Sequence, residues 1–223
     1  MAHLGIRKFQ DLVGRTDLLR PSDNVVNNKA KLLNLSLILK NALHLRPGVN
    51  IVGGSESQDF QLEKRLDNEL IARAQPVLDG KEKRVDIEMV INNECRAFTS
   101  TLSYHISMKY GEEGLPPNSI NIKLTGHAGQ SFCAFMTKGL HVTLEGDAND
   151  YVGKGLSGGE VIIYPPKSST FDSVKNVIVG NVCLYGATSG KAFFRGIAAE
   201  RFSVRILELL LLLKVLVIMA VNI

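Results

Sequence analysis

The spacing of hydrophobic residues changes about halfway along the chain, and each spacing predicts a different kind of element. Between Leu62 and Ala74, leucine or alanine recurs every four positions with charged residues on the opposite face, and Pro76 follows. This pattern predicts an amphipathic helix that ends at the proline. A further helix is predicted over about residues 97–110, with Leu102 and Ile106 directed inward. Residues 61–117 are therefore expected to form a helical lead-in.

The second half of the chain alternates apolar with other residues, which is the period of a β-strand. Such runs occur at residues 120–124, 140–144, 161–163 and 177–179, and each is followed by glycine or proline. The pattern predicts short strands separated by regular corners.

Glycines repeat along with these strands. Gly126 and Gly146 are 20 residues apart, as are Gly139 and Gly159, and residues 155–161 align with residues 186–192. A repeat of this length predicts stacked coils, because one coil of short strands cannot bury its own inner face. The predicted fold is a parallel β-helix, and a β-sandwich with glycine-rich turns is the alternative. The glycines predicted to be structural corner residues are Gly126, Gly129, Gly139, Gly146, Gly153, Gly155, Gly158, Gly159, Gly180, Gly186 and Gly190.

The first sixty residues lack a comparable repeat. A short helix is predicted from Ile6 to Val13, whose apolar residues share a face before Gly14. A polar, asparagine-rich stretch follows, and then an apolar run over residues 32–45. We interpret residues 21–60 as a tether that lies over a neighbouring surface outside this chain.

Composition excludes several classes of protein. The chain has 223 residues, of which 45% are hydrophobic and 22% charged, and this predicts a folded core. A net charge of +4 without a basic run gives no indication of nucleic-acid binding. The three cysteines are isolated and odd in number, so a reducing compartment is expected. The N-terminus lacks the apolar segment of a secretory signal, so secretion is not expected.

Two motifs resemble chemical sites, and each also has a structural explanation. Residues 153–158 match G-x-G-x-x-G, whose glycines let a pyrophosphate approach a helix. Residues 160–166 predict a strand rather than that helix, so the glycines are interpreted as corners. Asp147, Asn149 and Asp150 offer oxygen ligands for Ca²⁺ but lack the other positions of an EF-hand loop. We interpret them as side chains that cap turns.

Four longer stretches are jointly specific for one family. They are residues 126–131, 146–159, 180–190 and 198–205, beginning with Gly-His-Ala-Gly-Gln-Ser. Together they closely resemble the C-terminal domain of the glutamate synthase large subunit. Residues 4–18 resemble the segment that leaves the flavin domain in this family, so the resemblance covers residues 1–205.

The resemblance implies a mainly β fold: a right-handed parallel β-helix, or single-stranded solenoid, preceded by a few short helices and an extended tether. The family converts 2-oxoglutarate, glutamine and a reductant into two glutamates, with FMN and a 3Fe-4S cluster in the parent enzyme. Residues 157–159 and 164–167 look more like the pyridine-nucleotide-dependent type than the ferredoxin type. The implied role of this part is to brace the glutaminase and FMN domains, which are its expected partners.

No catalytic, cofactor-binding or metal-binding residue is expected in this chain. The family's nucleophilic cysteine and cluster cysteines belong to other domains, whereas Cys95, Cys133 and Cys183 are scattered. Cys133 is interpreted as a small buried hydrophobe. The parent enzyme is an oxidoreductase, and this chain is expected to be inactive alone.

These interpretations divide the chain into five segments. They are the end of the segment leaving the flavin domain (1–20), the tether (21–60), the helical lead-in (61–117), the first coils of the β-helix (118–205) and a tail (206–223). The alternatives are a stand-alone non-catalytic scaffold or interaction module and a tail-anchored membrane protein. The expected location is the cytoplasm, a plastid or a mitochondrion, and neither nucleic acid nor membrane is an expected partner.

The tail does not resemble the family. Residues 206–223 are mostly apolar, with Glu208 and Lys214 as interruptions. They are short for a membrane-spanning helix, and a central lysine would cost about 2.5 to 3.5 kcal/mol on insertion. Codons can be chosen for this tail so that one restored nucleotide after the Arg205 codon produces the family's usual sequence in the shifted frame. We predict that the tail is a frameshift product and that the chain is a fragment of a longer protein.

Overall fold

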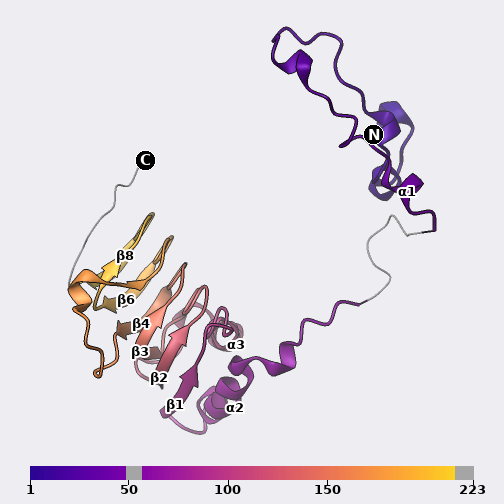
Figure 1. Cartoon of the computed structure of the whole chain (residues 1–223). Coiled ribbons are helices and arrows are strands. Elements are labelled where there is room, and N and C mark those ends of the chain that lie inside the picture. The colour runs from indigo at the N-terminus through magenta and orange to yellow at the C-terminus, as the bar shows by residue number, and fades with distance from the viewer. Residues whose placement is uncertain (49–56, 214–223) are drawn as a thin grey trace. The chain divides into compact units, whose positions relative to one another are not determined.

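The computed structural model describes residues 1–48 and 57–213, and the chain divides into two units, Met1–Phe60 and Gln61–Ile223 (Figure 1). The described secondary structure of the first unit consists of short helices. They are the 3₁₀ helices η1 (Ala2–Leu4), η2 (Phe9–Leu12), η3 (Thr16–Leu18) and η4 (Ala30–Leu32), and the α-helix α1 (Ala42–Leu45). The short helix predicted from Ile6 to Val13 is confirmed in part, because the 3₁₀ helix η2 forms over Phe9–Leu12. A helix this short is marginal unless its apolar face is buried, and none of the described side chains in this unit is buried.

The second unit contains the longer helices and the strands. The helices are α2 (Leu66–Leu78) and α3 (Ser100–Tyr110), with the 3₁₀ helices η5 (Leu62–Lys64), η6 (Gly111–Glu113) and η7 (Ser173–Lys175). The strands are β1 (Val85–Ile91), β2 (Ile120–Ala128), β3 (Leu140–Ala148), β4 (Ser157–Tyr164), β5 (Val177–Val179), β6 (Ser189–Phe194), β7 (Ile197–Ala198) and β8 (Glu208–Leu213).

All described strand pairs are parallel and belong to one eight-stranded sheet. The main strand order is β1-β2-β3-β4-β6-β8, while β5 pairs with β3 and β7. Gly126 lies opposite Gly146, as their 20-residue spacing predicts. Val161 lies opposite Ala192, which confirms the predicted alignment of those two stretches. Between β3 and β4, paired residues are 19 positions apart, as His141 and Glu160 are. Gly139 and Gly159 are 20 positions apart, so their spacing differs by one residue from the pairing of these strands.

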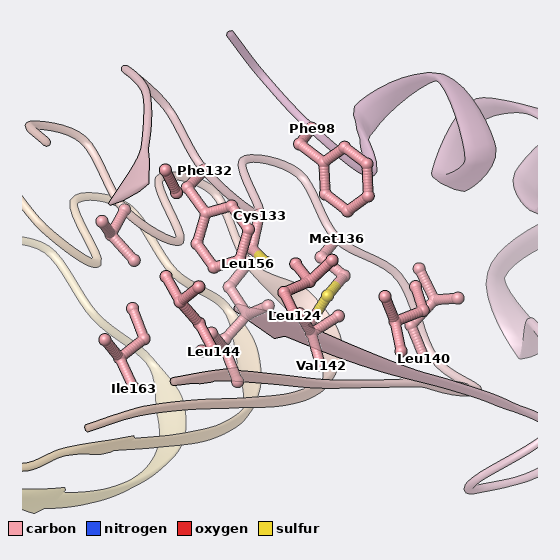
Figure 2. Packing of buried hydrophobic residues seen from close by; sticks show 14 of the residues in the cluster. Phe98, Leu124, Phe132, Cys133, Met136, Leu140, Val142, Leu144, Leu156 and Ile163 are labelled. Atoms are coloured by element: carbon pink, nitrogen blue, oxygen red, sulfur yellow. The ribbon is translucent and has the colours of Figure 1, made fainter. Parts of the chain in front are cut away.

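The core lies between the sheet and the turns that follow its strands. The register places the inward residues of neighbouring strands in rows, such as Leu124, Leu144 and Ile163, all of which are buried. Figure 2 shows these strand side chains directed toward Phe132 and Met136, which lie in the segment between β2 and β3. Because side chains alternate along a strand, the other face of the sheet carries mostly charged and polar residues.

The predicted fold class, a mainly β right-handed parallel β-helix or single-stranded solenoid, is wrong. The described strands form a single parallel sheet, and α2 and α3 contribute Leu70, Ala74, Leu102 and Ile106 to the same hydrophobic cluster, so the unit is an α/β fold. The β-sandwich alternative is wrong for the same reason. The predicted solenoid was based on the strand repeat from residue 118 onward, with the helices as a segment that precedes it.

One strand and two helix boundaries also differ from the prediction. Strand β1 lies within the expected helical lead-in, and its alternating apolar residues from Val85 to Ile91 are a strand signal that was missed. Pro76 lies inside α2, which continues to Leu78, since a proline near the last turn removes only one helical N–H donor. Helix α3 begins at Ser100 because Thr99 has a left-handed backbone conformation. The inward positions of Leu102 and Ile106 are confirmed.

Candidate functional site

Four five-residue turns stack beside the sheet and are the most regular feature outside the strands. They are residues 131–135, 151–155, 182–186 and 201–205, and each turn follows a strand. In every turn the first, third and fifth residues have positive φ, between 54° and 66°. The alternation of left-handed residues with ordinary ones lets each turn fold sharply while staying parallel to the next.

Backbone hydrogen bonds join successive turns into a ladder beside the sheet. The first residue of a turn donates its N–H to the carbonyl that precedes the next turn, and the same bond recurs at 2.8 Å. The pairs are Ser131 to Asp150, Tyr151 to Asn181 and Val182 to Glu200. The ladder satisfies backbone groups that would otherwise be left unpaired near the core.

Most of these left-handed positions hold residues other than glycine, and sequence reasoning missed them. Cys133, Val182 and Leu184 have φ values of 56°, 60° and 59°. A left-handed conformation costs such residues roughly 1 to 2 kcal/mol each, which only a surrounding structure can offset. The residue types give no signal here. For Cys133 and Leu184 the usable signal was position, because both occupy the same place in their turns as Gly153 does in another, whereas no turn has glycine at the place of Val182.

Several predicted corner glycines lie where chain segments approach closely. A Cβ on Gly146 would stand 1.7 Å from the carbonyl oxygen of Gly126, and a Cβ on Gly126 would stand 2.1 Å from that of Ile91. Gly186 differs, since nothing lies within 4 Å and only its φ of +66° favours glycine. A Cβ would also come within 3 Å of other atoms at Gly129, Gly139, Gly153, Gly155, Gly158, Gly159, Gly180 and Gly190. Their role as structural corners stays a prediction, which substitution would test.

The glycines of the G-x-G-x-x-G match lead into a strand and not into a helix. β4 begins at Ser157, and its last residue, Tyr164, precedes two prolines, as the sequence predicts. The geometry through which a helix N-terminus binds pyrophosphate is therefore not formed by residues 153–158.

The acidic and amide side chains after β3 bridge neighbouring turns. Asp150 Oδ1 accepts the backbone N–H of Asn181 at 2.7 Å, and Asn181 Oδ1 accepts an N–H from the next turn at 3.0 Å. Asn149 Oδ1 accepts the N–H of Asp150 at 2.9 Å, and Asp147 Oδ1 lies 2.9 Å from Nδ1 of His127. Within residues 1–48 and 57–213, no three His, Cys, Asp or Glu residues are grouped as metal ligands. These contacts support the interpretation of Asn149 and Asp150 as turn caps, whereas Asp147 lies within β3 and pairs with the side chain of His127 on β2.

One buried carboxylate joins the two long helices. Asp67, in the first turn of α2, is 2% exposed and accepts the backbone N–H of Thr99, the residue before α3, at 3.1 Å. Burial raises the pKa of Asp67, although Arg65 and the backbone amides of Thr101 and Thr99 act in the opposite direction. The carboxylate therefore satisfies donors at the start of α3, where negative charge is favourable. Sequence reasoning did not identify it.

The three cysteines do not form a ligand set. Burial raises the pKa of the Cys133 thiol far above its ordinary value, and it raises that of Cys183 to about 12. Cys95 is half-buried and precedes α3, whereas the other two lie in different turns. A cluster of the 3Fe-4S type needs several thiolates at one place, so these residues do not fit it. The prediction that Cys133 is a buried small hydrophobe is confirmed.

The first unit exposes an unusual number of large apolar side chains. Val26 is 92% exposed, and Leu32 and Leu37 are each 84% exposed. Further exposed apolar residues in this unit are Met1, Leu4, Phe9, Val13, Leu19, Leu33, Ile38, Leu45 and Phe60. Clusters of exposed apolar residues mark surfaces that bind other molecules. In the part of the chain that the structure describes, no helix is long and apolar enough to cross a membrane.

Comparison with known proteins identifies relatives along most of the chain. The family described as "GXGXG motif" matches residues 67–218. "Glutamate synthase [NADH]" of Schizosaccharomyces pombe is 52% identical over 205 residues, which cover 92% of this chain and 10% of that protein. "Glutamate synthase [NADPH] large chain" of Bacillus subtilis is 43% identical over 206 residues, covering 92% and 13%. The spinach protein "Ferredoxin-dependent glutamate synthase, chloroplastic" is 38% identical over 210 residues, covering 92% and 12%.

These comparisons confirm the resemblance to glutamate synthases. The identity is higher to the NADH-dependent and NADPH-dependent proteins than to the ferredoxin-dependent one, which confirms the predicted likeness to the pyridine-nucleotide type. The chain spans about a tenth of the length of these relatives.

Proposed function

The chain belongs to the GXGXG motif family, and from this premise we propose that it is a non-catalytic segment of a glutamate synthase that braces the glutaminase and FMN domains. The parent reaction would convert 2-oxoglutarate and glutamine to two glutamates with electrons from a pyridine nucleotide. In this proposal FMN and the 3Fe-4S cluster are held by other domains. The cytoplasm, a plastid or a mitochondrion is the proposed location.

The exposed apolar segment is the observation that carries this proposal. Leu32, Leu37 and Ile38 are 84%, 84% and 76% exposed, and no described side chain of residues 1–60 is buried. Exposing so many large apolar side chains is unfavourable unless another surface covers them. The relatives are about ten times longer than this chain, so the rest of such a polypeptide offers that surface.

The second unit is suited to the role of a brace. Its sheet, turns and helices share one hydrophobic cluster, and its turns are joined by a separate hydrogen-bond ladder. A strand or turn that contacts a similar strand or turn on both sides resists local unfolding, because both neighbours hold it in place. A rigid unit of this kind holds attached domains at a constant separation.

A chimera tests the proposal in a complete enzyme. The aligned segment of the Schizosaccharomyces pombe glutamate synthase would be replaced by residues 1–205 of this chain. We expect the chimera to assemble, to hydrolyse glutamine and to complete the NADH-dependent reaction. Replacing Leu32, Leu37 and Ile38 by serine should lower the thermal stability of the chimera and the coupling between glutamine hydrolysis and glutamate synthesis.

A matched control separates apolar contacts from a general effect of the substitutions. Lys29, Lys31 and Lys40 are exposed in the same segment, and their replacement by serine should leave stability and coupling unchanged. Equal behaviour of the two triple variants would contradict the bracing role of this segment. Recovery of the natural chain from cells without catalytic domains would instead support a stand-alone scaffold.

The tail remains a separate proposal. We propose that residues 206–223 result from a one-nucleotide frameshift, and residues 214–223 lie outside the described residues. Sequencing of the genomic DNA and the transcript through the Arg205 codon tests this directly. An uninterrupted reading frame that encodes the apolar tail would contradict it.

A further inference from the structure

Strand β1 ends the eight-stranded sheet, and alternate backbone groups along it point away from β2. Val85 N donates to Ser119 O at 2.9 Å, just before β2 begins, so the backbone of Val85 faces β2. Arg73, on α2, donates from Nη1 to the carbonyl of Glu88 at 2.9 Å, so the backbone of Glu88 faces outward. Backbone groups alternate in direction along a strand. The N–H and C=O of Val90 therefore also face outward.

Arg73 covers only part of this edge. Its guanidinium is fixed by an ion pair with Glu69, one turn earlier on α2, and it occupies the carbonyl of Glu88. Among residues 1–48 and 57–213, neither Arg73 nor any other group outside the β1–β2 pair forms a hydrogen bond with the N–H or C=O of Val90. The side chain of Val90 is 78% exposed, which is unusual for an apolar residue in a regular strand.

Two hollows adjoin the edge at this point. One, of about 950 Å³, is lined by residues 61–69 together with residues 90–97 except Asn93. The other, of about 490 Å³, lies over the charged face of the sheet next to β1. Leu66, Glu69 and Val90 line both hollows. The two hollows therefore form a continuous trough along the C-terminal half of β1.

We propose that this trough binds an extended segment of the parent polypeptide from outside this chain, which adds a strand to the free edge of β1 at Val90. The occupant is an extended backbone without proline at the pairing position and with an apolar side chain over Val90. Unpaired N–H and C=O groups on a sheet edge recognise that chemistry, and Val90 and Leu66 supply the apolar contacts. The inference rests on the proposed function, because it needs the remainder of the enzyme.

One observation favours the parent chain over a second copy of this chain. The relatives carry about nine tenths of their length outside the matched segment, which supplies many candidate strands. A second copy would pair through the same edge, and the concentration dependence of hydrogen exchange distinguishes the two occupants.

Hydrogen exchange tests the proposal at single residues. In the isolated chain, the outward amides of Glu88 and Val90 should exchange quickly, while the inward amides of Ile87 and Met89 are protected. In the assembled chimera, the Val90 amide should exchange at least about tenfold more slowly, while Ile87 and Met89 change little. Protection that grows with concentration of the isolated chain would overturn the proposal in favour of a second copy.

Substitution at the same residue provides an independent test. Val90→Pro removes the outward N–H without breaking the ladder to β2, whereas Val90→Thr keeps it. In the chimera, Val90→Pro should lower thermal stability and Val90→Thr should not, while circular dichroism of the isolated chain stays unchanged for both. Fast exchange at Val90 in an assembled, active chimera overturns this inference alone. A chimera that folds but neither assembles nor couples its two reactions overturns the proposed function.

Discussion

The two units of this chain place the same kinds of apolar residue in opposite environments. Leu124 and Leu140 in the second unit are 0% and 1% exposed, whereas Leu32 and Leu37 in the first unit are each 84% exposed. In the second unit, neighbouring strands pair in parallel and the successive turns are joined by hydrogen bonds. Short helices in the first unit have no repeated neighbour. The comparison shows that the second unit supplies its own core, while the described side chains of the first unit form none.

The largest loss of stability is expected for a substitution that forces two paired strands of the second unit apart. Gly146→Ala would place a Cβ 1.7 Å from the carbonyl oxygen of Gly126, so two paired strands must move apart. We expect a loss of about 4 kcal/mol in the free energy of unfolding, measured by urea denaturation. Gly186→Ala is the control, because no atom lies within 4 Å, and its positive φ should cost only about 1 to 2 kcal/mol. Equal losses would show that close approach is not what these glycines provide.

A leucine truncation compares the two units directly. Leu124→Ala should lower the free energy of unfolding by about 3 kcal/mol, because it leaves a cavity among buried side chains. Leu32→Ala should change the stability of the isolated chain by less than about 0.5 kcal/mol, because the side chain is exposed. Urea denaturation of both variants measures the difference. A large loss for Leu32→Ala in the isolated chain would mean that the first unit buries this residue.

The buried carboxylate gives a smaller effect that depends on pH. Asp67→Ala should cost about 1 to 3 kcal/mol, because it leaves donors at the start of α3 unpaired. Asp67→Asn keeps an acceptor. Since the folded-state pKa of Asp67 is raised, the native protein binds more protons than the unfolded chain between the two pKa values. The stability of wild type relative to Asp67→Asn should therefore fall as pH rises above about 3.8, the ordinary pKa.

Asp86 provides a control of opposite sign for that experiment. Arg84 holds the pKa of this exposed carboxylate below its ordinary value, so its contribution is present above that value and is lost as pH falls through the folded pKa. Wild type should therefore gain stability relative to Asp86→Asn as pH rises. Urea denaturation between pH 3 and pH 7 measures both trends. Parallel trends would contradict the assignment of Asp67 as a desolvated group.

The smallest expected change in stability concerns the thiols. Cys95→Ser should alter the free energy of unfolding by less than about 0.5 kcal/mol, because Cys95 lies outside the turns. A thiol reagent should modify Cys95 first in the folded chain. Burial raises the pKa of Cys183 to about 12 and that of Cys133 still further, so little thiolate is present at neutral pH. Rapid modification of all three thiols before unfolding would contradict this order.

Much of the second unit was predictable because its signals are local. Alternating apolar residues predicted β2, β3, β4 and β5, since a strand with one buried face needs period-two alternation. The family motifs predicted the relatives correctly. The same alternation was present in β1, and assigning that region to helices concealed it.

The candidate site was less predictable, because its residues depend on contacts between distant parts of the chain. Asp67 caps a helix that begins 33 residues later, at Ser100, and no local pattern marks it. Val90 is an ordinary strand residue by type, and only the sheet order places it at a free edge.

The sequence by itself determined the family, the positions of strands β2, β3, β4 and β5, and the register of Gly126 with Gly146. Motifs, alternation and glycine spacing can all be read directly from the order of residues along the chain. Only the tertiary structure decided that two helices share the core with a single parallel sheet. It also decided that valine, leucine and cysteine adopt left-handed conformations in the turns. Those outcomes depend on hydrogen bonds and packing between layers, which outweigh the local preference of each residue.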